Sequence, residues 1–280
     1  MRRMMILLTL LLSNLTGFAA SAQDVRISIA SGVSGGTYRG VYAADLEKQL
    51  ADYTVIHRLS SGSGENLEML ADGRAAFGFA QADVYAVRLA ADPERFSDLT
   101  VLGHLGVECL FIAVRKDGPI HTLAELGGSV GDRPPEIAIG PPPGGASGTW
   151  QHLALLAPGL TAAIAHPVGD RMALRYLERG TFDAVVWVTD PSNFDHRMLR
   201  AVRESAQLEL LEVDDEAFTS TLPDGSQVYE TGQVRLEKNG VPAQTVCTSA
   251  ILLAGSDTDP AAMKRARRMR GLRQLGTTAD

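Results

Sequence analysis

The chain is poor in several residue types and patterns that define other classes of protein. Its 280 residues include only 2 cysteines and 6 histidines, and these show no metal-ligand spacing. Neither a phosphate-loop lysine nor a dinucleotide-binding fingerprint occurs. We therefore expect no bound metal and no cofactor. Beyond the N-terminal segment, no apolar run approaches the roughly 18 residues that a membrane-spanning helix needs.

Positive charge is also scarce. Lysine and arginine number 26 against 33 aspartate and glutamate residues, which gives a formal net charge of −7 at pH 7. An acidic surface repels phosphate groups, so we do not expect nucleic acid or anionic lipid as a partner. The length fits one large domain or two lobes, and no internal repeat is visible.

The N-terminus predicts export. Arg2 and Arg3 form a short basic start, residues 4–12 are apolar, and residues 20–22 (ASA) match a small-x-small cleavage site. The apolar run is too short to span a bilayer. We expect residues 1–22 to be a cleavable signal peptide and the mature protein to be periplasmic. The alternative is an uncleaved N-terminal anchor.

Strand-like and helix-like segments alternate through most of the chain. Residues 25–30 alternate between apolar and polar side chains, and residues 75–80 and 107–114 are short apolar runs typical of buried strands. This alternation favours an α/β architecture with mostly parallel strands. The pattern weakens over residues 214–245, where Asn239-Gly240 predicts a hairpin turn.

Three turns rich in glycine and hydroxyl side chains stand between strand-like and helix-like segments. They are residues 31–37 (SGVSGGT), 60–64 (SSGSG) and 144–149 (GGASGT). A helix start carries unpaired N–H groups and partial positive charge, and glycine lets an oxygen atom come close. The three turns together predict a cleft that binds a small anionic molecule.

The same turns carry a resemblance to a known family. The chain resembles the TAXI family of TRAP transporter receptors at residues 31–38, 61–67, 77–84, 139–149 and 180–184. The resemblance implies an α/β periplasmic binding protein of type II, with two hinged lobes and a ligand cleft between them. It also implies that the protein captures a small organic acid or an amino acid such as glutamate. A TRAP membrane permease driven by an ion gradient would receive that ligand.

The resemblance further implies discontinuous lobes in a monomeric protein. We expect residues 23–117 and 246–280 to form lobe one and residues 118–245 to form lobe two. The run of prolines at residues 141–143 departs from the family pattern, because proline removes N–H donors and stiffens the third turn.

Matching positions give the candidate ligand-binding residues. Hydroxyl and amide groups can donate hydrogen bonds to a carboxylate, glycines allow close approach, and a tyrosine ring can wall the cleft. The candidates are Ser34, Gly35, Gly36, Thr37, Tyr38, Ser61, Ser63, Gln81, Asp83, Gly145, Ser147, Gly148 and Thr149. We expect no catalytic residue among them.

Simpler interpretations stand beside these assignments. A serine or threonine before a helix is often only an N-cap, Asp83 can cap the helix that follows it, and Trp187 fits a buried core better than a cleft wall. Glu108 can form an ion pair between the lobes. Gly32-x-Ser34-x-Gly36 matches the nucleophile elbow of a serine hydrolase, although no earlier strand is available to build that sheet. A ligand-binding sensor module is a further alternative, because one fold serves several functions.

The two cysteines lie in apolar strand-like runs. An even number of cysteines in an oxidising compartment permits one disulfide. If the two strands are antiparallel neighbours, Cys109 and Cys247 each fall at the start of a strand and therefore near opposite ends of the pair. This placement disfavours a disulfide without excluding one.

Overall fold

The computed structural model describes residues 25–213, 217–222 and 225–273. The expected signal peptide, residues 1–22, lies outside the described residues. In these ranges no helix has the length and apolar character needed to cross a membrane.

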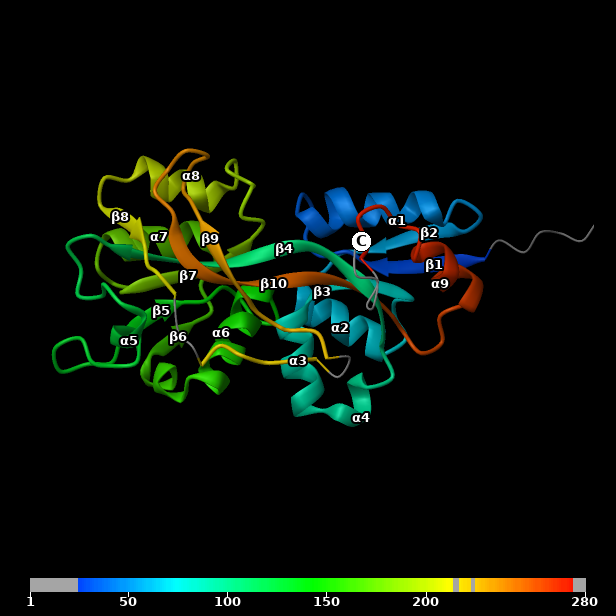
Figure 1. The fold of residues 1–280 in the computed structure, drawn as a ribbon, viewed down its shortest axis with the longest axis horizontal. Helices are drawn as coiled ribbons and strands as arrows, with labels where there is room; N and C mark the ends of the chain where they lie inside the picture. Colours follow the sequence, from blue (N-terminus) through cyan, green and yellow to red (C-terminus); the bar gives the residue numbers. More distant parts are fainter. Residues whose placement is uncertain (1–24, 214–216, 223–224, 274–280) are drawn as a thin grey trace, which may run out of the picture.

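A single mixed sheet of ten strands runs through the molecule (Figure 1). Two groups of parallel strands flank a pair of long antiparallel strands, β4 and β10. The main path is β2 (Thr54–Arg58), β1 (Arg26–Ala30), β3 (Phe77–Gln81), β10 (Ala243–Ala254), β4 (Thr100–Arg115), β7 (Ala184–Thr189), β5 (Glu136–Ala138) and β6 (Ile164–His166). Off this path, β8 (Leu208–Leu210) pairs with β4, and β9 (Glu230–Val234) pairs with β10.

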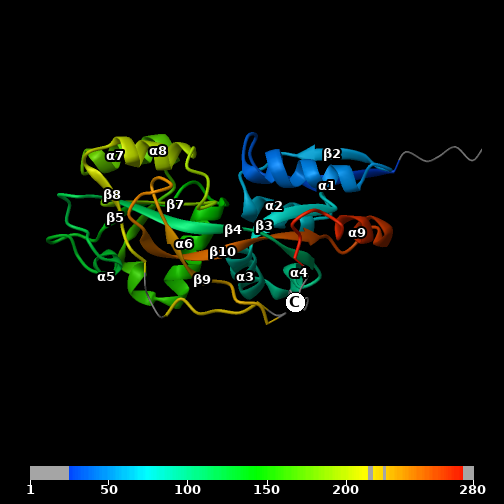
Figure 2. The same cartoon turned by 45° about the horizontal axis from the view of Figure 1, so that its top comes forward.

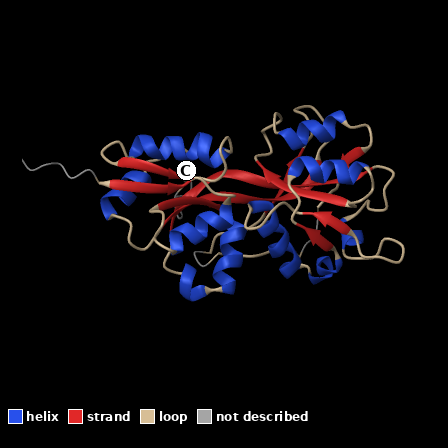
Figure 3. Cartoon of the chain, turned by 180° about the vertical axis from the view of Figure 1, so that it is seen from behind, coloured by secondary structure: helices blue, strands red, loops and turns tan. Residues whose placement is uncertain are grey.

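Helices cover both faces of the sheet (Figure 3). They are the π-helical turn η1 (Tyr38–Tyr42), α1 (Ala43–Gln49), α2 (Ser63–Ala71), α3 (Ala82–Ala91), α4 (Pro93–Phe96), α5 (Leu123–Leu126), α6 (Gly145–Leu156), the 3-10 helix η2 (Pro158–Ala162), α7 (Asp170–Glu178), α8 (Arg197–Glu204) and α9 (Pro260–Ala266). The four-residue spacing of Tyr38, Leu46 and Leu50 gives one buried face along η1 and α1, as the sequence predicts.

The elements gather into two lobes. Lobe one holds β1, β2 and β3 with α1, α2, α3 and α9, and lobe two holds β5, β6 and β7 with α6, α7 and α8 (Figures 1 and 2). Strand β4 belongs to both, because its first part pairs with β10 and its second part pairs with β7 and β8. The α/β two-lobe fold is therefore confirmed, with β4 and β10 as the strands that connect the lobes.

The hydrophobic core differs between the two faces of the sheet. Under α2, α3 and α6 one continuous cluster joins both lobes and includes Leu67, Tyr85 and Trp150. On the opposite face, under α1 in lobe one and α7 and α8 in lobe two, the apolar side chains form two separate clusters. Trp187 belongs to the lobe-two cluster and stacks on Phe111, with ring centroids 5.2 Å apart. The apolar core is thus interrupted between the lobes on the α1 and α8 face.

The expected separation of the cysteines is wrong. Cys109 and Cys247 lie directly opposite each other in the antiparallel register of β4 and β10, with Cα atoms 3.9 Å apart, and a disulfide joins them. The sequence pattern places the start of the strand at residue 107, whereas β4 begins at Thr100. Cys109 therefore sits inside the strand rather than at its end, which brings it beside Cys247.

Candidate ligand-binding site

A cavity of about 490 Å³ lies between the lobes on the α1 and α8 face. Lobe one contributes the loop between β1 and η1, the start of α2 and the end of β3, and β4 contributes Glu108. Lobe two contributes the start of α6, the end of β7 and the segment that leads into α8. The lining residues are Gly32, Val33, Ser34, Gly35, Gly36, Thr37, Tyr38, Gly62, Ser63, Gln81, Glu108, Gly145, Ala146, Val188, Thr189, Asn193, Asp195, His196 and Arg197.

The cavity lies where parallel strands end and helices begin. The carboxyl ends of β1, β3 and β7 meet it, and this edge is the usual place for a ligand in an open α/β sheet. The N-cap residues of α2, α6 and α8, which are Gly62, Gly144 and His196, make no side-chain capping hydrogen bond. Residues at these three helix starts line one cavity, where the partial positive charge of a helix N-terminus favours an anion.

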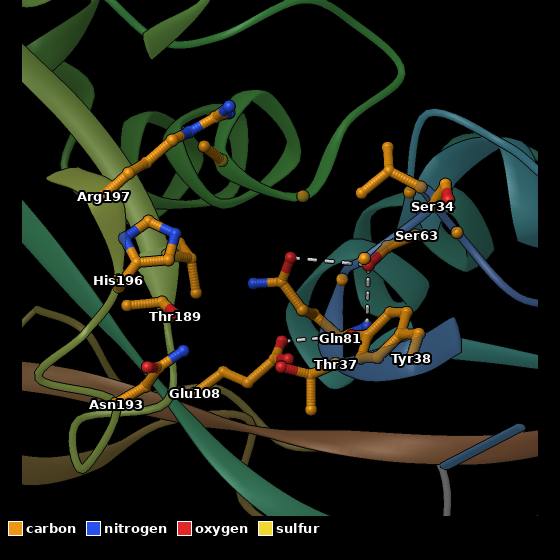
Figure 4. A pocket seen from close by; sticks show the side chains of 18 of the residues that line it. Ser34, Thr37, Tyr38, Ser63, Gln81, Glu108, Thr189, Asn193, His196 and Arg197 are labelled. Atoms are coloured by element: carbon orange, nitrogen blue, oxygen red, sulfur yellow. Dashed lines mark hydrogen bonds between the residues drawn. The ribbon is translucent and has the colours of Figure 1, made fainter. Parts of the chain in front are cut away.

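Eight of the thirteen candidate residues line this cavity. They are Ser34, Gly35, Gly36, Thr37, Tyr38, Ser63, Gln81 and Gly145, and Figure 4 shows the side chains of Ser34, Ser63 and Gln81 on one wall. Gly35 and Gly62 adopt φ angles of 82° and 132°, a region that favours glycine. The sequence thus locates the lobe-one wall, while contact of these residues with a ligand stays a prediction.

Ser63 and Gln81 fix each other on the cavity floor. The Ser63 hydroxyl accepts a hydrogen bond from the Gln81 backbone N–H at 3.1 Å and donates to Gln81 Oε1 at 3.4 Å. A Cβ atom on Gly145 would overlap the Gln81 side chain, so glycine at that position lets α6 come close. Gly64 N–H donates to Pro143 O at 3.0 Å, which brings the first turns of α2 and α6 into contact.

Asp83 and Thr149 lie behind the cavity in a buried network. Asp83 Oδ2 accepts hydrogen bonds from the Thr149 hydroxyl at 2.6 Å and the Tyr229 hydroxyl at 3.1 Å, and Oδ1 accepts from Val84 N–H at 2.7 Å. Burial raises the pKa of Asp83 to about 6, although these hydrogen bonds oppose the shift. Thr149 also accepts from Gln81 Nε2 at 3.2 Å. The network joins α3 to α6 and holds the cavity floor.

The remaining candidates serve local structure. Ser61 donates from its backbone N–H and its hydroxyl to Glu65 Oε2, both at 2.8 Å, which stabilises the start of α2. Ser147 donates to Gly144 O at 2.9 Å inside α6. At Gly148 a Cβ atom would lie 2.8 Å from Val84 Cγ2, so glycine permits close packing of α6 on α3. None of these three lines the cavity, and Ser147 therefore does not face it with Ser34 and Ser63.

Several lining residues are absent from the sequence-based set. Thr189 ends β7, and Asn193, Asp195, His196 and Arg197 follow that strand. This segment has no glycine-rich signature, so nothing in the sequence pattern selects these residues. In Figure 4 the side chains of Thr189, His196 and Arg197 form the wall opposite Ser34 and Ser63.

Glu108 is a further lining residue outside that set. The Tyr38 hydroxyl donates to Glu108 Oε2 at 3.0 Å. The pKa of Glu108 is raised from 4.5 to about 7, mainly by burial and also by the negative charges of Asp83 and Asp190, while the hydrogen bond from Tyr38 opposes the shift. The sequence-based alternative for Glu108, an ion pair between the lobes, is not found among the described residues. Nor do those residues contain a group of three or more His, Cys, Asp or Glu side chains arranged to hold a metal ion.

The two lobes and the cavity between them have the fold of a type II periplasmic binding protein. Within that class the chain belongs to the NMT1-like family, whose model matches residues 29–262. A comparison with curated protein sequences gave no match.

Solved structures share the fold at low sequence identity. CAE31940 from Bordetella bronchiseptica is 16% identical, with 88% of this chain and 69% of that chain covered, at a TM-score of 0.54. XAC2383 from Xanthomonas citri bound to chloride ion is 13% identical, with 87% of this chain and 82% of that chain covered, at a TM-score of 0.53. Lactococcal OpuAC in its closed form with glycine betaine is 11% identical, with 88% of this chain and 84% of that chain covered, at a TM-score of 0.51. These structural similarities show that the chain shares its fold with the three proteins.

Proposed function

We propose that this protein is a periplasmic solute receptor that captures a small organic acid or amino acid and delivers it to a TRAP membrane transporter driven by an ion gradient. The observation that carries the proposal is the cavity between the lobes, where the starts of α2, α6 and α8 converge. Its volume of about 490 Å³ suits a small metabolite rather than a polymer.

The chemistry of the walls supports an acidic group on the ligand. Backbone N–H groups at helix starts bind carboxylates without a dedicated cation. Ser34, Thr37 and Ser63 add hydroxyl groups on the lobe-one wall, and Arg197 adds a guanidinium at the start of α8. Lobe closure would remove water from these groups and strengthen each contact.

The transporter partner rests on the motif resemblance. Two of the segments that resemble TAXI receptors, residues 31–38 and 61–67, contribute most of the lobe-one wall of the cavity. In this proposal residues 1–22 direct export. The lobe boundaries follow residues 117 and 245, close to the end of β4 and the start of β10.

A thermal-shift screen of the processed chain with dicarboxylates and amino acids tests the binding step. A compound that binds only the folded protein raises the melting temperature. Uptake of that compound by vesicles that contain TRAP membrane subunits and an imposed ion gradient tests delivery. Binding with no uptake stimulation would favour a sensor module, and binding followed by chemical conversion would favour an enzyme.

A further inference from the structure

Glu108 places a carboxylate in a cavity whose other walls favour anions. Its side chain extends from β4 toward η1 and accepts the hydrogen bond from Tyr38, and in Figure 4 it points toward Tyr38 and Thr37 and away from Arg197. The residue is half-buried, and no lysine, arginine or histidine of the described ranges forms an ion pair with it. A carboxylate that is partly withdrawn from water without a cation is unfavourable, so a positively charged group in the cavity would stabilise it.

The neighbours of Glu108 add further negative charge around it. Asp83 on α3 and Asp190 after β7 both act on it as negative charges, and Asp195 lines the same cavity. The Tyr42 hydroxyl, one turn along η1, accepts from Gly106 N–H at 3.2 Å and carries no positive charge. The end of the cavity around Glu108 is therefore electronegative.

The rest of the cavity lining has the opposite character. Residues 32–36 and the starts of α2 and α6 bring glycine, hydroxyl groups and helix N-termini, with no acidic side chain among their lining residues. Arg197 and His196 stand on the far wall (Figure 4). The cavity thus combines groups suited to an anion with a carboxylate that lies beside Tyr38 and Thr37.

We propose that Glu108 binds a protonated amine of the ligand, so that the site selects zwitterions that carry an amine and a carboxylate and rejects simple dicarboxylates. The inference rests on the proposed receptor function and narrows its ligand class. Tyr38 is a positioning residue, because its hydroxyl holds the carboxylate of Glu108 toward the cavity. An amine supplies the missing positive charge, whereas a second carboxylate near Glu108 adds repulsion.

Matched ligand pairs test this selectivity. L-glutamate and glutarate, L-aspartate and succinate, and L-alanine and propionate each differ by one amine. Titration calorimetry of the processed chain at about pH 8 keeps Glu108 ionised, since its pKa lies at about 7. The variants are Glu108→Gln, which removes the charge, and Glu94→Gln, a matched control at an exposed position on α4.

We expect the wild type to bind the amine member of at least one pair at least about tenfold more tightly than its deaminated partner. Glu108→Gln should reduce that ratio below about threefold, and Glu94→Gln should preserve it. Tyr38→Phe, which removes only the positioning hydroxyl, should lower the ratio by about threefold and serves as the test if Glu108→Gln does not fold.

Two results would overturn the inference while leaving the receptor function in place. One is equal or tighter binding of the deaminated acid by the wild type, and the other is an unchanged ratio in Glu108→Gln. If no member of any pair binds, the receptor function fails together with the inference.

Discussion

The Thr149 hydroxyl donates a 2.6 Å hydrogen bond to Asp83 Oδ2, and this contact joins α6 of lobe two to α3 of lobe one. Asp83 is fully buried, and Tyr229 donates to the same oxygen. On this face of the sheet the lobes also share a continuous hydrophobic core. The two lobes are therefore tied together on the α3 and α6 face, opposite the cavity on the α1 and α8 face.

Replacing Thr149 by valine should destabilise the protein. The substitution keeps the size of the side chain but leaves the buried Asp83 carboxyl and Gln81 Nε2 each short of one partner, which costs about 1–3 kcal/mol. Urea unfolding followed by circular dichroism measures the change. Thr100→Val at the exposed start of β4 is the control and should change the free energy of unfolding by less than about 0.5 kcal/mol. Equal stability of the two variants would contradict a structural role for the contact.

Loss of the disulfide should lower stability strongly. Cys109 and Cys247 are 138 residues apart in the chain, so their bond closes a long loop that contains most of lobe two. Removing a native disulfide typically costs about 2–5 kcal/mol. The melting temperature of the double variant Cys109→Ala, Cys247→Ala should fall below that of the oxidised wild type. Adding a reductant should lower the wild-type value and leave the variant unchanged; a shift in the variant would mean that the reductant acts elsewhere.

Glu108 should make the wild type less stable as pH rises. The pKa of its carboxyl is raised from 4.5 to about 7 in the folded protein, so the folded state binds the proton more tightly than the unfolded state. Below about pH 4.5 the group is protonated in both states, and the loss of stability develops as pH rises through about 7. The free energy of unfolding of Glu108→Gln relative to wild type should therefore grow with pH, by up to about 3 kcal/mol. A constant difference between the two proteins over this range would show that Glu108 titrates normally.

Ligand affinity should depend on pH in opposite directions for the two ligand classes. Raising the pH from about 5.5 to about 8 ionises Glu108, which strengthens binding of an amine and weakens binding of a dicarboxylate. The groups around Glu108 are Tyr38, Tyr42, Asp83, Asp190, Asp195, His196 and Arg197. Glu108→Gln keeps all of them, so a pH dependence that survives in the variant belongs to these neighbours and not to Glu108.

The sequence predicts the lobe-one wall of the cavity, which lies at the carboxyl ends of parallel strands. The alternating pattern of residues 25–30 identifies β1, and the short apolar run of residues 75–80 identifies β3. The glycine turns at residues 31–37 and 60–64 meet because β1 and β2 are parallel neighbours whose carboxyl ends share one edge. Helix starts are local features, so composition alone locates them. Their convergence follows from strand direction.

Other features depend on how distant strands pair, so the local sequence pattern does not predict them. Strands β6 and β9 are short and mostly exposed, so neither shows an apolar pattern. The disulfide follows from the full length of β4, which begins at Thr100, before the apolar run that marks it in the sequence. Glu108 reaches the cavity because β4 crosses between the lobes there, and no neighbouring residue in the chain indicates this.

Titration calorimetry of the processed chain beside its Ser34→Trp variant tests the central claim most directly. Ser34 is exposed at the cavity wall, so the indole should fill the cavity and leave the fold and the melting temperature of the free protein unchanged. The account predicts one bound zwitterion per wild-type chain and no binding to the variant. Unchanged binding by a folded Ser34→Trp variant would place the ligand outside the cavity between the lobes and contradict the account.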